Sequence, residues 1–225
     1  MNEFTADPVQ TIVVKPSTHF DTITAAAFAS GLSLAQADLD SEPWRTWLAG
    51  SFTKSVRQAK RPADLERLRT LDLPRIEIAV GDAVNIAFVP APYDQSPREI
   101  SRLQVSGLDL EREATAGGNY ARAGAVTPHI EINREAAMST GKTAAQVSHA
   151  VCAWLLAQPL GTRRAWAQRP GISLSEISFV EQDDEVETQA SLSTSERRLI
   201  VIRDNGLTEV TPGTTTVRVF AERFA

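Results

Sequence analysis

The chain has 225 residues, of which 42% are hydrophobic and 23% are charged. This composition argues against a disordered chain or a coiled coil, and the length suits one large domain or two small ones. The 23 Lys and Arg against 28 Asp and Glu give a net charge of −5, so nucleic-acid binding would require a local basic patch. A single cysteine, Cys152, with three His excludes an internal disulfide and a cysteine-rich zinc site.

The predicted elements alternate between strands and helices. Short β-branched runs beside turn residues predict strands, and apolar residues at helical spacing predict helices. In chain order the expected strands are 11–15, 54–58, 76–80, 85–89, 129–134, 177–181, 199–203 and 215–220. Helices are expected from Ile23 into 35–39, over 63–71 and over 142–156, the last with Ser139 or Thr140 as its N-cap. The alternation predicts the α/β class.

The segment 111–127 is rich in Gly and Ala and has no apolar periodicity, which is typical of a linker. It separates a first domain, 1–110, from a second, 128–225. The first ten residues carry two acids and no basic residue, and no apolar run approaches the roughly 18 residues that a membrane span needs. We therefore expect a soluble, cytoplasmic protein with no secretory signal and no membrane contact.

The two halves resemble each other in the order of their elements. A shift of 118 residues places Ile12 on Ile130, and a shift of 122 places Asp82 on Asp204. Offsets that drift so little predict an internal duplication, although two α/β segments could share this rhythm by chance. A duplication implies a pseudo-dimer within one monomeric chain, with the halves packed as two subunits would be.

Two segments of the second half carry the chemistry, MSTGKTAAQVSHA at 138–150 and VIRDNGLTEVTPGTTTV at 201–217. Lys142 falls in the first turn of a predicted helix, where free backbone N–H groups attract anions, and Gln146 follows one turn later on the same face. Asp204 leaves a predicted strand at the sheet edge, a common place for sites in α/β proteins. A hairpin would bring Thr216 within its reach.

These motifs resemble those of the archaeal and eukaryotic-type (class two) peptidyl-tRNA hydrolases over about residues 128–220. The resemblance implies two tandem units, the first degenerate, each a small mixed sheet flanked by helices. It also implies hydrolysis of the ester between a peptide and the 3′ ribose of tRNA, with peptidyl-tRNA as partner and no DNA, metal or organic cofactor. The family's functional residues fall on Lys142, Gln146, Asp204 and Thr216. Lys142 would stabilise the oxyanion, Asp204 would orient Lys142 or act as base, and the other two would position substrate or water.

Contacts to RNA are expected from Arg203 and from the segment RRAWAQR, 163–169, which we expect to be a loop. Its cations Arg163, Arg164 and Arg169 could hold a backbone while Trp166 stacks a base; alternatively Trp166 packs on the core. Positions that are often basic in the family read Ala137, Ser139, Thr140 and Leu207, which weakens phosphate contacts.

The first half lacks the functional residues. A shift of 119 places Ile23 on Lys142 and Ala27 on Gln146, so the first half is expected to be a scaffold in place of a second subunit. His149 is expected to be structural and Cys152 to be buried. Two functions remain open. One is an esterase with one site in the second half, and the other is an inactive family member that binds a small molecule or a protein.

Overall fold

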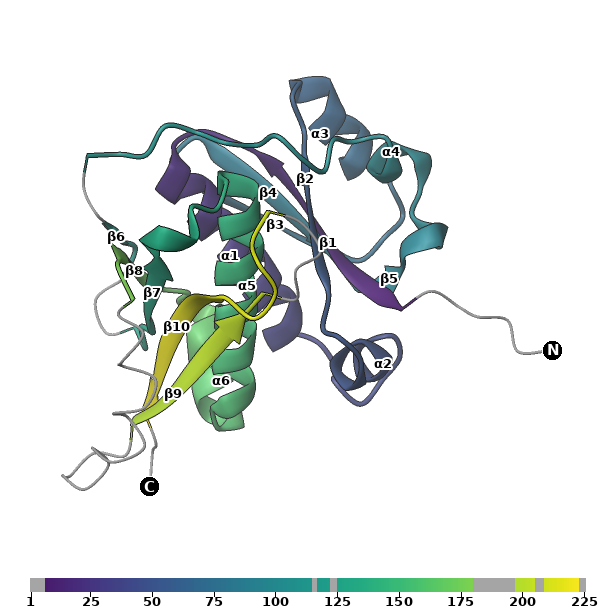
Figure 1. The fold of residues 1–225 in the computed structure, drawn as a ribbon. Coiled ribbons are helices and arrows are strands. Elements are labelled where there is room, and N and C mark those ends of the chain that lie inside the picture. The colour runs from purple at the N-terminus through teal and green to yellow at the C-terminus, as the bar shows by residue number, and fades with distance from the viewer. Residues whose placement is uncertain (1–6, 115–116, 122–124, 180–196, 205–208, 223–225) are drawn as a thin grey trace.

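The computed structural model describes residues 7–114, 117–121, 125–179, 197–204 and 209–222 (Figure 1). These residues form two mixed sheets with helices packed against them, which confirms the predicted α/β class. In chain order the elements are β1 (Pro8–Lys15), α1 (His19–Ala35), α2 (Trp44–Ala49), β2 (Lys54–Gln58), α3 (Pro62–Arg69), β3 (Arg75–Val80), β4 (Ala83–Phe88), β5 (Ala91–Pro92), α4 (Arg98–Ser101), β6 (Gly117–Asn119), β7 (His129–Asn133), α5 (Thr140–Ala157), α6 (Leu160–Gln168), β8 (Ser173–Ile177), β9 (Arg197–Arg203) and β10 (Thr215–Glu222), with short 3-10 helices at Tyr93–Gln95 and Arg134–Ala136.

The two sheets share one strand order. The first sheet runs β2-β1-β4-β3 with β5 also paired to β1, and the second runs β6-β8-β7-β10-β9. The shared order covers four strands of each sheet, with β6 added at the edge of the second. β1 is parallel to β2 and antiparallel to β4, just as β7 is parallel to β8 and antiparallel to β10, and β3–β4 and β9–β10 are antiparallel hairpins. The registers match as well: Ile12 pairs with Val56 and Ala87, and Ile130 pairs with Leu174 and Val219.

The registers also correct one predicted correspondence. Ala87 pairs with Ile76 in the first hairpin, and Val219 pairs with Ile200 in the second. Counting along the strand from Ile76 and Ile200, Asp204 falls on Val80. The predicted match of Asp204 to Asp82 is therefore wrong, because hydrogen-bond register sets the correspondence and a sequence shift does not.

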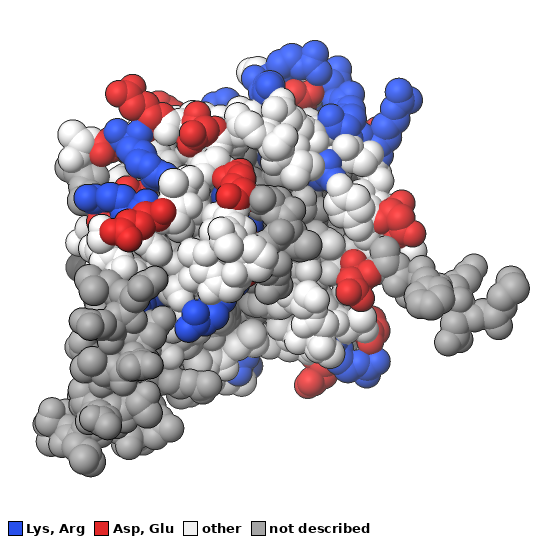
Figure 2. All heavy atoms as spheres, viewed as in Figure 1, with Lys and Arg blue, Asp and Glu red and all other residues white. Residues whose placement is uncertain are grey.

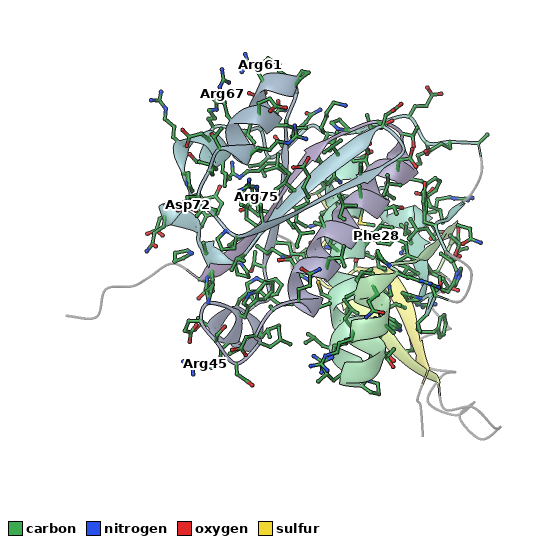
Figure 3. All side chains as sticks on the ribbon, turned by 180° about the vertical axis from the view of Figure 1, so that it is seen from behind. Phe28, Arg45, Arg61, Arg67, Asp72 and Arg75 are labelled. Atoms are coloured by element: carbon green, nitrogen blue, oxygen red, sulfur yellow. The ribbon has the colours of Figure 1, made fainter. Side chains whose placement is uncertain are left out.

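Helices α1 and α5 lie between the sheets (Figure 1). Their side chains meet near both ends, His19 with Thr140 at 2.9 Å and Ser30 with Cys152 at 3.4 Å, so the two helices run in the same direction. A Cβ on Gly31 would lie 2.7 Å from the ring of Trp166, which shows how closely α1 approaches α6. Phe28 on the same helix, labelled in Figure 3, has its ring centroid 6.1 Å from that of Trp166. One continuous apolar cluster therefore spans both halves.

The helix N-caps correct a second correspondence. Thr18 accepts a hydrogen bond from the backbone N–H of Asp21, and Ser139 accepts one from that of Lys142, as expected for helix N-caps. Aligning the caps places Asp21 on Lys142, a shift of 121 residues. The predicted counterparts Ile23 and Ala27 are therefore wrong, and Asp21 and Ala25 take their places.

Most predicted elements are present, but α2 and α4 were not predicted and α1 begins and ends four residues earlier than expected. Three further differences concern the second half and the expected linker. The expected strand 177–181 is found as β8 at Ser173–Ile177, and residues 180–181 lie outside the described part of the chain. The expected loop 163–169 is largely helix α6, whose only buried residue is Trp166, so its sequence carries little apolar periodicity. Within the expected linker 111–127, β6 pairs with β8.

Candidate functional site

A cavity of about 250 Å³ opens between the two halves of the chain. One wall comes from α5 and the end of β9, and the other comes from residues 51–54, at the start of β2. The prediction of a site in the second half alone therefore differs from what the structure shows. The residues that line the cavity are Ser51, Thr53, Lys54, Lys142, Ala145, Gln146, His149, Val201, Ile202, Arg203 and Asp204.

Three of the four residues predicted to be catalytic converge in this cavity. The ammonium of Lys142 forms an ion pair with Asp204, and the Gln146 side-chain amide donates a hydrogen bond of 2.9 Å to the same carboxylate oxygen. The Lys142 side chain keeps 14% of its surface exposed, whereas that of Asp204 keeps 2%. Lys142 and Gln146 are four residues apart on α5 and so lie on one helix face, which lets both side chains reach the same oxygen of Asp204.

Asp204 is held in place by its backbone as well as by its side chain. Its N–H donates to Thr214 and its carbonyl accepts from Gly213, at 3.0 and 2.7 Å. Farther along the same loop, the carboxylate of Glu209 accepts hydrogen bonds from the backbone and hydroxyl of Ser139. An acid at this end of α5 is favourable to the helix dipole. The loop is thus fastened to the helix that carries Lys142.

Thr216 is placed next to the site but outside the cavity lining. It is fully buried and lies at a bulge, because Thr215 pairs with Arg203 and Val217 with Ile202. Its hydroxyl donates a 3.0 Å hydrogen bond to the Ile202 carbonyl. A bulge bends the strand and interrupts the backbone hydrogen bonds between the two strands. The Thr216 hydroxyl supplies a hydrogen bond to the Ile202 carbonyl of β9, the strand that leads to Asp204.

Sequence reasoning missed the contribution of the first half. Lys54 is only 9% exposed, although it begins a strand whose Val56 also points into the core. A charged residue at an inward-facing strand position was the available signal, because unpaired charges are rarely buried. Burial lowers the pKa of Lys54.

His149 lines the same cavity, on the turn of α5 after Gln146. Burial lowers its pKa well below 6.5, and the nearby charges of Lys54 and Lys142 lower it further. Its ring lies edge-on to Phe52, with centroids 5.2 Å apart. His149 is therefore neutral at pH 7, and the positive charge of the cavity comes from the lysine and arginine side chains.

The predicted RNA contacts are mostly not part of the cavity. Arg203 lines it, while Arg163 and Arg164 lie on α6 and do not. Trp166 is fully buried, and its indole N–H donates to the Gly171 carbonyl at 3.0 Å. Base stacking by Trp166 is therefore wrong, and the alternative, packing on the core, is confirmed. Leu207 lies outside the described residues.

Two further observations bear on the site and its surroundings. In the described part of the chain, no three His, Cys, Asp or Glu side chains are grouped so that they could hold a metal ion. Within the same residues, no helix has the length and apolar character needed to span a bilayer.

No curated protein matches the chain. Residues 129–221, less than half of the chain, match the family model described as peptidyl-tRNA hydrolase PTH2. The match begins at β7 and ends within β10, so it includes α5 with Lys142 and Gln146 and the end of β9 with Asp204. The C-terminal half is thus the part of this chain that carries the likeness to the class two peptidyl-tRNA hydrolases, as its two motifs predicted.

Proposed function

We propose that the protein hydrolyses the ester between a peptide and the 3′ ribose of tRNA. The observation that carries the proposal is the meeting of Lys142, Asp204 and Gln146 at an open cavity, within the segment that matches the hydrolase family. A fixed ammonium beside a small cavity suits a reaction in which negative charge develops on a carbonyl oxygen.

In the proposed reaction a water oxygen attacks the ester carbonyl, and the bond from the carbonyl carbon to the ribose 3′ oxygen breaks. Lys142 stabilises the charge that develops on the carbonyl oxygen. Asp204 holds the ammonium in place and accepts the proton of the attacking water, which is then transferred to the departing 3′ oxygen. Gln146 fixes the carboxylate through its 2.9 Å hydrogen bond. Thr216 acts on the site through the strand that carries Asp204.

The test is the release of the blocked amino acid from an N-acetyl-aminoacyl-tRNA by the wild type and by Lys142→Ala. Loss of one positioned charge-stabilising group lowers kcat by about 10²–10³-fold. Lys60→Ala, which removes an exposed cation that does not line the cavity, is the matched control and should retain full activity. Equal rates for Lys142→Ala and the wild type would refute the assigned role.

We also propose that the two halves are tandem units that form a pseudo-dimer inside one chain, with 111–127 as the connection. Support comes from the common strand order, the matching registers and the equivalent N-caps. A monomer that unfolds in a single transition is the expected result in sedimentation and urea denaturation. Separate transitions for the halves would contradict it, because one apolar cluster spans both.

A second candidate is a module that binds a small molecule or a protein without catalysis, which the net charge of −5 favours over tRNA binding. Lys and Arg gather where α3 and α4 lie, and Arg61 and Arg67 point outward there (Figures 2 and 3). However, Asp64 pairs with both of them and with Arg102, so much of this charge is offset. Titration with tRNA at about 50 mM salt separates the two functions, because electrostatic contacts are strongest at low salt. No binding under that condition would support the module.

A further inference from the structure

We propose that Lys54, supplied by the N-terminal half, binds an anionic group of the ligand, so that the site is composite. If the proposed function holds, this group is the phosphodiester next to the terminal ribose. The first half is then a contributor to substrate binding as well as a scaffold. The inference rests on the proposed function only for the name of the ligand.

The contacts of Lys54 join three elements. Its ammonium donates hydrogen bonds to the side chains of Gln10 and Ser30, at 2.8 and 3.0 Å, and to the sulfur of Cys152 at 3.4 Å. These partners come from β1, α1 and α5, and all three are neutral acceptors. The ammonium also lies 4.4 Å from the ring centroid of Trp47 and 4.7 Å from that of Phe52. Lys54 is thus held firmly at the cavity without a carboxylate among these partners.

The corresponding position in the other half carries no charge. Val56 and Leu174 take equivalent places in the two ladders, so Lys54 corresponds to Ile172. Ile172 is a fully buried part of the apolar core. An ammonium at a core position costs desolvation energy that an isoleucine does not, and such charges concentrate at functional sites.

The backbone beside Lys54 is strained. Phe52 has a φ of 55°, in the left-handed region that a bulky side chain rarely adopts. This conformation accompanies the placement of its ring against both the Lys54 ammonium and the His149 imidazole. Strain of this kind clusters at ligand-binding sites.

The charges that line the cavity favour an anion. Among the described lining residues the cations are Lys54, Lys142 and Arg203, and Asp204 is the carboxylate. Asp204 forms its ion pair with Lys142. The lining therefore has an excess of positive charge in a chain whose net charge is −5. A phosphate oxygen is a stronger acceptor than the thiol of Cys152, the most distant of the three partners of the Lys54 ammonium, and would take its place.

The probes that test this are adenosine 5′-monophosphate and adenosine, which differ only in the phosphate. We expect calorimetry to show at least tenfold tighter binding of the monophosphate to the wild type. Lys54→Met, of similar shape and without charge, should remove most of that difference. Lys60→Met, at an exposed position outside the lining, should keep it. An unchanged preference in Lys54→Met, or no preference in the wild type, would overturn the proposal.

A second variant covers the case in which Lys54→Met does not fold. Ser51 is exposed and lines the cavity from the same half, so Ser51→Glu adds a negative charge there without disturbing the core. We expect it to weaken monophosphate binding at least fivefold, while Ser106→Glu, exposed and outside the lining, leaves binding unchanged. Equal binding by the two glutamate variants would contradict the proposal.

The same samples separate this inference from the proposed function. Monophosphate binding that depends on Lys54, in a protein that does not hydrolyse N-acetyl-aminoacyl-tRNA, would support the anion site and refute the hydrolase. Hydrolysis with a monophosphate preference that does not depend on Lys54 would support the hydrolase and refute the anion site.

Discussion

The hairpin β3–β4 of the first half and the hairpin β9–β10 of the second half differ most where the site lies. The first closes with the two residues Gly81 and Asp82, with Gly81 at a φ of 53°. The offset between the halves grows from 124 at Ile76 and Ile200 to 132 at Ala87 and Val219, so the second hairpin is eight residues longer. The extra residues lie between Arg203 and Val217, in the connection that begins at Asp204 and at the bulge of Thr216.

The helices show the same contrast. In α5 the residue at the third helical position is Lys142, which pairs with the acid of the long loop. In α1 that residue is Asp21, which contacts the tight turn at Gly81 and accepts a 2.9 Å hydrogen bond from Tyr120. The four central strands of the two sheets have the same order, so at this end the halves differ in a loop and in the residues of one helical turn, which carry the proposed catalytic residues.

The largest effect is expected when Asp204 is given the residue of its counterpart, Val80. Asp204→Val should lower kcat by about 10²–10³-fold, because Lys142 loses the carboxylate that holds it and the water loses its proton acceptor. The hydrolysis assay measures this. Asp82→Asn, on the turn of the first hairpin, is the control and should leave the rate unchanged. A rate for Asp204→Val near that of the wild type would show that the carboxylate presented by the longer hairpin is not needed for hydrolysis.

The packing between the halves is tested by Gly31→Ala. The added methyl group would meet the ring of Trp166 at 2.7 Å and the side chain of Val151 at 2.8 Å. We expect a loss of about 3 kcal/mol in the free energy of unfolding, measured in urea, because both neighbours lie in the core. Gly161→Ala in α6 is the control, since nothing lies within 4 Å of its added methyl group and alanine favours helix. Equal effects would show that the halves are not closely packed at this point.

The bulge of the second hairpin is tested by Thr216→Val. Valine has the same shape but cannot donate to the Ile202 carbonyl, and an unsatisfied buried group costs about 2 kcal/mol. Urea denaturation should show this loss, and Thr216→Ser should recover most of it. If Thr216 instead contacts substrate, hydrolysis will fall much more than stability does.

The smallest effect concerns the pH dependence of stability. Aligned by their N-caps, α1 has Phe28 where α5 has His149. The pKa of His149 is lowered well below 6.5, so the unfolded chain binds more protons here and stability falls as the pH drops below 6.5. The cost of this group is therefore small at neutral pH and grows as the pH falls further below 6.5. In urea denaturation, His149→Phe should lose that part of the pH dependence, and a slope identical to the wild type would contradict the assignment.

Local patterns predicted α1, α5 and most strands, because periodicity and N-cap residues act over a few neighbouring positions. They also indicated Lys142, Gln146 and Asp204, which the structure brings to one cavity. They failed where contacts between distant segments decide the outcome. The bulge at Thr216 depends on the partner strand, and the burial of Trp166 depends on α1.

The sequence by itself determined the elements and the residues able to carry the chemistry. Only the tertiary structure decided that the first half lines the cavity, because Lys54 reaches it through the pairing of β1 with β2 and the packing of α1 against α5. The hydrogen bonds of Lys54 join residues 24 to 98 positions apart in the chain, and no local pattern records them. The excess of positive charge at the site follows from this packing, because the packing places the Lys54 ammonium in the same cavity as the Lys142–Asp204 ion pair.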